Sequence, residues 1–214
     1  MNKFLAIAVA GFAFAAVSQA SAASYSPPSA VFGPLTTDFT QGGLTLAGFD
    51  TTLGTLTGVN INLFARATLN GSVTNNASTP QSFRVSTDTT VELSGGPGAF
   101  SNVFVDLLAS QNYSNIPAGG SASFGPYTLS NIVNVAGTPL SDYTAGPLNF
   151  SGVAVSTKTT STNIGAAITA VADGKVTVTY TYTPTPPTSV PEPASMALLG
   201  MGLAGLGLIR RRSV

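Results

Sequence analysis

The residue types that most enzymes use for catalysis are sparse in this chain of 214 residues. It contains no cysteine and no histidine, so it offers no thiolate, no histidine base and no zinc site of the usual ligand sets. Serine is plentiful, but without histidine the usual serine nucleophile has no base. Calcium needs only oxygen ligands, yet no D-x-D-x-D spacing occurs. We therefore predict a protein that is not an enzyme, with no catalytic residue, no metal site and no cofactor.

The acidic side chains do not form the carboxylate pair that a glycosidase needs. Such a pair stands about 5–10 Å apart. Asp88 and Glu92 lie four positions apart on one expected strand, which puts their Cα atoms about 13 Å apart. We expect both on a solvated strand face. Asp50 is expected to cap the Thr51-Thr52 turn through its side chain, and whether Asp38 approaches it is left open.

Three tyrosines are the candidates for contact with a glycan. Tyr113, Tyr127 and Tyr143 fall near expected loops, where their rings could stack on sugars. The competing interpretation is that they pack at the edges of the fold with their hydroxyl groups in water, and it is favoured because tryptophan is absent. A polysaccharide-binding module is therefore an alternative function.

The charge of the chain is low and unevenly distributed. Charged residues are 7% of the sequence and the formal net charge is +0. Outside Lys3 and the C-terminal arginines, the basic residues are Arg66, Arg84, Lys158 and Lys175, and the acidic residues before the tail are Asp38, Asp50, Asp88, Glu92, Asp106, Asp142 and Asp173. The exported part is thus net acidic by about three and offers no positive surface for the phosphate backbones of nucleic acids, so we expect no nucleic-acid partner.

The last stretch of the chain, residues 190–214, has three consecutive parts. Val190, Pro191, Glu192 and Pro193 form a corner through which no helix can run. Ala194–Ile209 carries no ionisable side chain and predicts a transmembrane helix of roughly 24 Å against a hydrocarbon core of about 30 Å. The basic cluster Arg210, Arg211 and Arg212 is a stop-transfer signal that stays on the cytoplasmic side, so we expect the body outside the cytoplasm.

This arrangement resembles the PEP-CTERM sorting signal of exopolysaccharide-producing Gram-negative bacteria, which combines such a motif, a single hydrophobic span and a terminal basic cluster. The resemblance implies recognition by an exosortase, a membrane-embedded cysteine-dependent protease or transpeptidase that removes the tail on the way to the surface. The alternative is a plain C-terminal membrane anchor that is never processed.

The other end of the chain, residues 1–22, predicts a secretory signal peptide with a helical apolar region. Lys3 supplies the positive charge, and Ala20, Ser21 and Ala22 form an A-x-A cleavage site. Cleavage after Ala22 is the favoured prediction, which leaves Ala23 as the first residue, and cleavage after Ala20 is the alternative. The Sec translocon and the inner membrane are then partners in transit.

The body, residues 23–183, has the pattern of short strands. Residues 59–70 and 83–93 alternate apolar and polar side chains with a period of two, and we expect them to form a hairpin. Residues 103–108 and 148–155 are further strands. Residues 121–130 form a strand that Pro126 confines to a sheet edge or a bulge. These patterns predict a single all-β domain of the sandwich type.

The last part of the body fits two patterns. Residues 163–172 fit a strand or a helical stripe, and we favour a strand because Asp173 and Gly174 together predict a hairpin turn. A strand over residues 176–183 follows, and residues 184–189 form a spacer rich in proline and threonine.

Two parts of the body resemble the choice-of-anchor E domains, which are bacterial surface modules joined to different anchoring tails. The similar segments are Phe49–Val59 and Val176–Pro184. The resemblance implies a compact extracellular β-domain without known catalytic residues.

Together these patterns predict an exported, non-enzymatic protein, and the resemblance to PEP-CTERM proteins implies a place at the cell surface or in the biofilm matrix. We expect it to be anchored transiently in the inner membrane, with its body outside, before exosortase processing. Exopolysaccharide is a further candidate partner.

Overall fold

The computed structural model describes residues 21–186 and 200–203. Along the body the elements, with η for short 3-10 helices, are β1 (Ala23–Tyr25), β2 (Ala30–Thr36), β3 (Phe39–Leu46), η1 (Thr51–Leu53), β4 (Gly54–Asn75), β5 (Gln81–Ser94), η2 (Gly98–Asn102), β6 (Phe104–Ile116), β7 (Ser121–Ala136), η3 (Leu140–Tyr143), β8 (Leu148–Thr159) and β9 (Ile164–Pro184).

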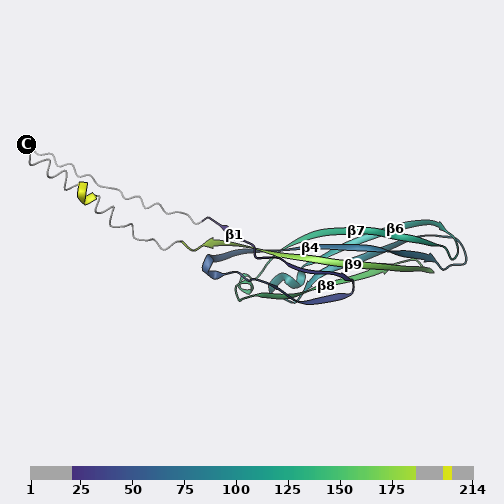
Figure 1. Cartoon of the computed structure of the whole chain (residues 1–214), viewed down its shortest axis with the longest axis horizontal. Coiled ribbons are helices and arrows are strands. Elements are labelled where there is room, and N and C mark those ends of the chain that lie inside the picture. The colour runs from purple at the N-terminus through teal and green to yellow at the C-terminus, as the bar shows by residue number, and fades with distance from the viewer. Residues whose placement is uncertain (1–20, 187–199, 204–214) are drawn as a thin grey trace, which may run out of the picture. The chain divides into compact units, whose positions relative to one another are not determined.

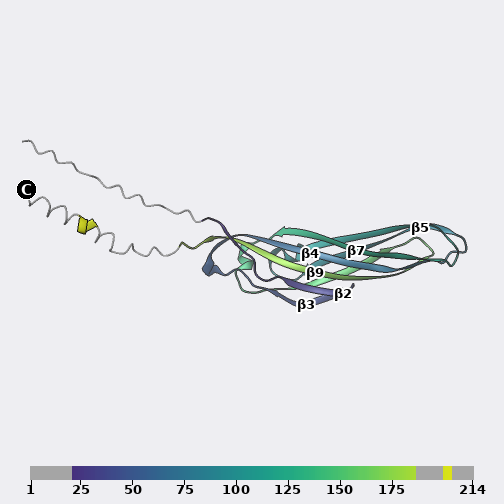
Figure 2. The same ribbon diagram turned by 45° about the horizontal axis from the view of Figure 1, so that its top comes forward.

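The strands form two antiparallel sheets that pack on each other (Figures 1 and 2). The five-stranded sheet has the order β1-β9-β4-β7, with β2 also pairing with β9 beyond β1. The four-stranded sheet has the order β3-β8-β5-β6. The predicted all-β, sandwich-like body is thus confirmed.

Apolar side chains of both sheets meet in one core. Ile61, Leu63 and Leu69 of β4 are fully buried and belong to the same cluster as Val85 and Val91 of β5. The period of two in both segments is therefore the alternation of core-facing and outward-facing side chains that the sequence predicts.

The expected hairpin between residues 59–70 and 83–93 is wrong. β4 pairs with β7 and β9, whereas β5 pairs with β6 and β8, so the two strands belong to opposite sheets. The connection 76–80 crosses from one sheet to the other. Periodicity shows which face of a strand is buried, but two strands facing one core can pair with each other or lie across from each other.

The expected turn at Asp173 and Gly174 is also wrong, although the strand predicted before it is confirmed. β9 continues through both residues, with Asp173 opposite Arg66 and Gly174 opposite Ala65 of β4. Asp173 accepts a hydrogen bond from Arg66 Nε at 2.9 Å. The glycine serves packing instead, because a Cβ at Gly174 would overlap the ring of Phe32.

The prediction for Pro126 is confirmed. β7 is the last strand of its sheet, and the pairing of β4 with β7 shifts register between Leu69 and Gly71, opposite the Gly125–Pro126 step. From the other sheet, Gln111 of β6 fixes this irregular segment by accepting a hydrogen bond from Gly125 N at 3.2 Å.

The predictions for the two ends of the chain fall largely outside the described residues. This applies to Ala20, to Val190–Pro193, to most of Ala194–Ile209 and to Arg210–Arg212. Residues 200–203 are helical. Within the ranges 21–186 and 200–203, no helix has the length and apolar character needed to cross a membrane. The transmembrane helix therefore stays a prediction.

Tyr180 gives the body a defined response to alkaline pH. Its side chain is fully buried and its hydroxyl donates to Ala47 O at 2.8 Å. Burial, followed by the neighbouring phenols of Tyr143 and Tyr25, raises the pKa of Tyr180 from 10.0 to about 12. Because the folded state favours the neutral phenol, its contribution to stability is complete below pH 10 and is lost as the pH rises through 12.

We therefore expect thermal unfolding scans to show falling stability between pH 10 and pH 12. Tyr180→Phe should flatten this fall, while lowering stability by about 1 kcal/mol at pH 7 through loss of the bond to Ala47. An alkaline profile identical to that of the unchanged protein would contradict the assignment.

Candidate functional site

The first and last strands of the body lie side by side. β1 pairs antiparallel with the end of β9, with Ala23 opposite Tyr182 and Tyr25 opposite Tyr180. Ala22 is exposed and precedes the first paired residue, Ala23. Both ends of the body therefore leave from the same end of the sandwich, which we call the tail pole and which comprises Ala23, Asp50–Leu53 and Thr183–Thr185.

At the tail pole, the end of β9 is bonded to the turn η1 and to the start of β4. Thr185 N donates to Leu53 O at 3.2 Å, and Pro184 lies opposite Gly54. Gly54 has φ 150°, and a Cβ there would overlap Thr183 O, so this position requires glycine. Paired structure thus extends to Thr185, five residues before Val190 in the sequence.

Asp50 holds this turn in place, as its sequence context predicts. Its Oδ1 accepts hydrogen bonds from Thr52 N at 2.9 Å and from Thr52 Oγ1 at 2.7 Å. The Thr52 hydroxyl and then its backbone N–H hold the pKa of Asp50 below its ordinary value. Asp50 is therefore a capping residue of η1.

Aromatic side chains fill the interior beside the tail pole. Phe49 packs on Tyr180 and Tyr182, with ring centroids 5.6 Å and 5.3 Å apart. Phe49 N also donates to Tyr143 O at 2.7 Å. The end of the body from which both tails leave is thus firmly packed.

Two of the three tyrosines named as candidates for glycan contact, Tyr113 and Tyr143, are buried. Tyr143 is fully buried, and its hydroxyl accepts from Ala99 N at 3.3 Å. Tyr113 is 7% exposed, stacks on Phe83 and donates to Ser123 O at 2.9 Å. Burial is the main cause of the raised pKa of both phenols. Neither ring can stack on a sugar.

Tyr127 is the half-buried member of the three. Its hydroxyl donates to Gln111 Oε1 at 3.1 Å, beside the irregular segment of β7. A shallow depression of about 400 Å³ opens there, lined by Asn70, Gly71, Ser123, Phe124, Gly125, Pro126 and Thr169. Its side chains are uncharged, and its phenylalanine is almost fully buried.

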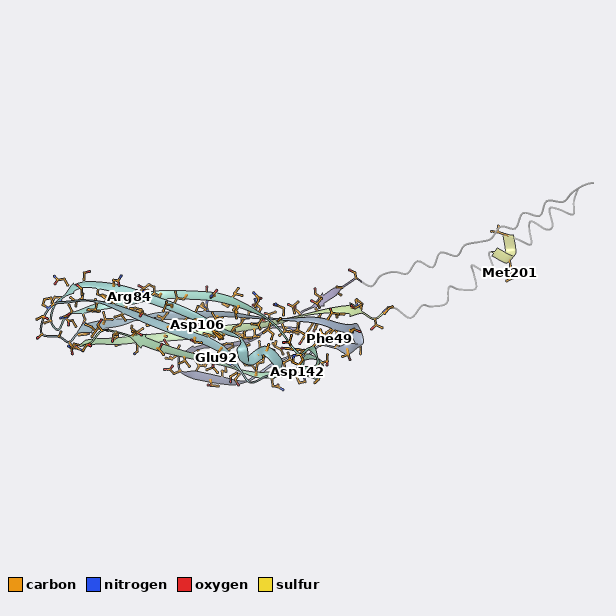
Figure 3. All side chains as sticks on the ribbon, turned by 180° about the vertical axis from the view of Figure 1, so that it is seen from behind. Phe49, Arg84, Glu92, Asp106, Asp142 and Met201 are labelled. Atoms are coloured by element: carbon orange, nitrogen blue, oxygen red, sulfur yellow. The ribbon has the colours of Figure 1, made fainter. Side chains whose placement is uncertain are left out.

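The acidic side chains lie apart, as the sequence predicts. Asp88 and Glu92 are exposed on the outer face of β5, and Asp106 accepts from Thr90 Oγ1 at 2.7 Å. Arg84, Asp106 and Glu92 follow one another along the body toward the end where Phe49 lies (Figure 3). Asp38 accepts instead from Ser156 N. In the described part of the chain, no three acidic side chains gather to hold a metal ion.

The sequence does not predict that the first and last strands of the body, β1 and β9, pair with each other at the tail pole. β1 has only three residues, too few for a periodic pattern, and its partner lies at the other end of the body. The alternating Thr and Tyr side chains of residues 179–183 indicate a strand, but they do not name its neighbour.

Fold and tail together define an all-β body followed by a short spacer and a C-terminal sorting segment. Residues 189–212 match the PEP-CTERM protein-sorting motif. This match includes the predicted Val190–Pro193 and Arg210–Arg212. The motif implies export across the membrane toward the cell surface, with an exosortase as the processing partner.

Other comparisons do not assign the body. No curated protein matches the chain. A structure of the infectious bursal disease virus Gx strain is 14% identical with a TM-score of 0.22, over 84% of this chain and 43% of the viral chain. One of the Gt strain is 11% identical with a TM-score of 0.11, over 92% and 52%. The chain thus spans about half of these viral chains, and such scores support no argument about fold or function.

Proposed function

We propose that this chain is a non-enzymatic surface or extracellular-matrix protein of an exopolysaccharide-producing Gram-negative bacterium, released from a transient membrane anchor by an exosortase. The observation that carries this proposal is the match of residues 189–212 to the PEP-CTERM protein-sorting motif. The spacing of the motif, apolar span and terminal arginines supports it, because each part serves one step of export and retention.

The geometry of the tail pole supports processing close to the body. Both ends leave the same end of the sandwich, so a signal peptide and a C-terminal span can engage one membrane without the chain crossing its own fold. Among the described residues of the body, Thr185 makes the last backbone hydrogen bond, to Leu53 O. Residues 186–189 then separate it from Val190 and span at most about 14 Å when extended.

The chemistry of the body supports a non-enzymatic role. The acidic groups of the described residues are spread over separate strands and turns, and Asp38, Asp50 and Asp106 each accept a structural hydrogen bond. We further propose that the body is a domain of the choice-of-anchor E type, on the resemblance of Phe49–Val59 and Val176–Pro184. These segments form the tail-pole ends of β4 and β9, which pair with each other.

Direct binding of polysaccharide is the second candidate function. The uncharged depression beside Tyr127 favours it, because its lining includes residues with amide and hydroxyl groups, Asn70, Ser123 and Thr169, together with Pro126. Retention of the body on exopolysaccharide from the native host measures this function separately from sorting.

Glu192→Ala tests the proposed function. We expect release of the mature protein to fall by about tenfold or more. The substitution removes the hydrogen bonds that the exosortase would make to the Glu192 carboxylate, and hydrogen bonds to a charged group contribute about 1.5–3 kcal/mol. Intact mass and membrane fractionation in the native host report cleavage and release. Glu92→Ala is the matched control, because Glu92 is the other glutamate of the chain and lies exposed on β5.

Equal maturation of Glu192→Ala and the unchanged protein would contradict recognition of the motif. A full-length mass for the unchanged protein in the membrane fraction would show instead a permanent, unprocessed anchor.

A further inference from the structure

The outer edge of β7 is open over its second half. β7 pairs on one side with β4, and within the described body no strand pairs with its other side. Contacts from Gln111 and Tyr113 of β6 cover the first half, at Ser123–Tyr127. From Thr128 to Ala136 no side chain is buried. This half therefore offers a row of backbone donors and acceptors about 30 Å long.

This open segment lacks the protection that natural edge strands usually carry. Residues 128–136 contain no charged residue and no proline. Other edge strands carry a proline, a charge or a register shift: β2 contains Pro34 and shifts register, β3 shifts register after Gln41, and β6 carries Asp106. The first half of β7 has such protection at Pro126, and the second half has none. An unprotected, uncharged edge is a site for pairing with another strand.

The side chains of the segment are apolar enough to make such pairing favourable. Leu129, Val133 and Val135 pack only partly against the core, and Ile132 is 52% exposed on the outer face. These positions lose contact with water when a further strand covers the edge.

Ile132 marks the centre of the open edge. Its backbone N–H donates to the side chain of its own neighbour, Asn131 Oδ1, at 2.8 Å. Gly137 N donates to Val59 O, and because hydrogen-bonded and non-hydrogen-bonded pairs alternate along an antiparallel ladder, the pair of Ile132 with Phe64 is a non-hydrogen-bonded one. The N–H of Ile132 thus points outward from the sheet. Asn131 lies opposite Ala65, on the core-facing side of the strand, yet it is exposed. Asn131 therefore satisfies an edge donor that a neighbouring strand would otherwise bond.

We propose that β7 pairs antiparallel with β7 of a second copy of this chain, centred on Ile132. The outward N–H and C=O of Ile132 would exchange bonds with those of the partner's Ile132, as in a hydrogen-bonded pair. The five-stranded sheets of the two copies then join into one continuous sheet, through an interface in which both copies use the same surface.

A second copy fits because the segment is complementary to itself in this register. The two Ile132 side chains face each other on the outer side, where Ser130 lies opposite Asn134 and can hydrogen-bond to it. On the core side Leu129 lies opposite Val135. Apolar cross-strand pairs of this kind stabilise a sheet. The body carries seven acidic and four basic side chains and is therefore net acidic. The edge itself is neutral, so no like charges meet across the pair.

Sedimentation velocity of the body, residues 22–185, tests this interface. The strands of this part pair with one another and enclose one core, and it forms a compact unit by itself. We expect a concentration-dependent dimer. Ile132→Lys should weaken it by about tenfold or more, because two ammonium groups then face each other. Asn131→Val should strengthen it several-fold, because the outward N–H of Ile132 is freed and an apolar pair with Val133 is gained.

Val31→Lys is the matched control, since Val31 is 57% exposed on the same sheet but lies on β2. Circular dichroism melts verify that each variant is folded. A body that stays monomeric at every concentration overturns the proposal, and so does equal weakening by Ile132→Lys and Val31→Lys. Because the chain has no cysteine, a spin label on Ile132→Cys gives a single distance between copies. A short distance supports the β7 pair and a long one overturns it. Neither result depends on sorting.

Discussion

Replacing Asn75 with alanine is expected to lower the free energy of unfolding by about 3–5 kcal/mol. The side chain of Asn75 is fully buried at the end of the body away from the tail pole, which we call the far pole and which comprises residues 75–80, 117–120 and 160–163. Its Nδ2 donates to Thr79 O at 2.9 Å and to Ile116 O at 2.9 Å, with Pro117 O at 3.2 Å, and its Oδ1 accepts from Ala77 N at 2.9 Å.

The backbone of Asn75 makes the same connections. Its N–H donates to Gly120 O and its C=O accepts from Gly119 N, while the next N–H, of Asn76, donates to Asn163 O. Asn75 thus links the loop between β4 and β5 to the loop between β6 and β7. Its neighbour Asn76 links both to the loop between β8 and β9. Removal of the amide breaks all of these side-chain hydrogen bonds at once. Each contributes about 0.5–1.5 kcal/mol, and this is why the expected cost exceeds that of one hydrogen bond.

Thermal and denaturant unfolding of the body measure this effect, with Asn76→Ala as the control. Asn76 is exposed, so its replacement should change stability by about 0.5 kcal/mol or less. Asn75→Asp keeps the shape but turns a carboxylate toward three carbonyl oxygens, so it should be most destabilising at neutral pH and recover in acid. If Asn75→Ala and Asn76→Ala had equal effects, the far pole would not depend on the amide.

The sequence predicts which face of a strand is buried and which strand lies at a sheet edge better than it predicts which strands pair with each other. Alternation in residues 59–70 and 83–93 gives the correct buried faces, and Pro126 gives the correct sheet edge. The pairing of those two strands with each other is wrong, because their patterns carry no information on which sheet each joins. The tyrosines show the same limit: Tyr143 follows turn residues and suggests an exposed loop, yet its ring fills the core beneath that loop.

The same limit applies to the candidate site: its contiguous sequence motif is predictable, and the parts built from distant segments are not. The tail is recognisable because Val190–Pro193 and Arg210–Arg212 are contiguous sequence signals that need no tertiary partner. The tail pole and the open edge of β7 arise from pairing between distant segments, such as Ala23 with Tyr182. Nothing local in the sequence specifies such pairs.

Phe32 explains why two strands of the sandwich each need a glycine where they face its ring. Its side chain is fully buried between the sheets, and a Cβ on Gly152 of β8 or on Gly174 of β9 would overlap its ring. The ring therefore occupies space that side chains of both sheets would otherwise fill. This is why Asp173 and Gly174, which predict a turn by their residue types, instead lie within a continuous strand.

A double-mutant cycle tests this packing directly. Gly174→Ala should destabilise the body by about 3 kcal/mol through overpacking, and Phe32→Ala by about 3–5 kcal/mol through the cavity that it leaves. The double variant should cost about 2 kcal/mol less than the sum, because the new methyl group enters the vacated space. Gly58→Ala is the matched control, a strand glycine whose added Cβ would make only ordinary contact with Thr181. Additive costs in the cycle would show that the strain at Gly174 does not come from the ring of Phe32.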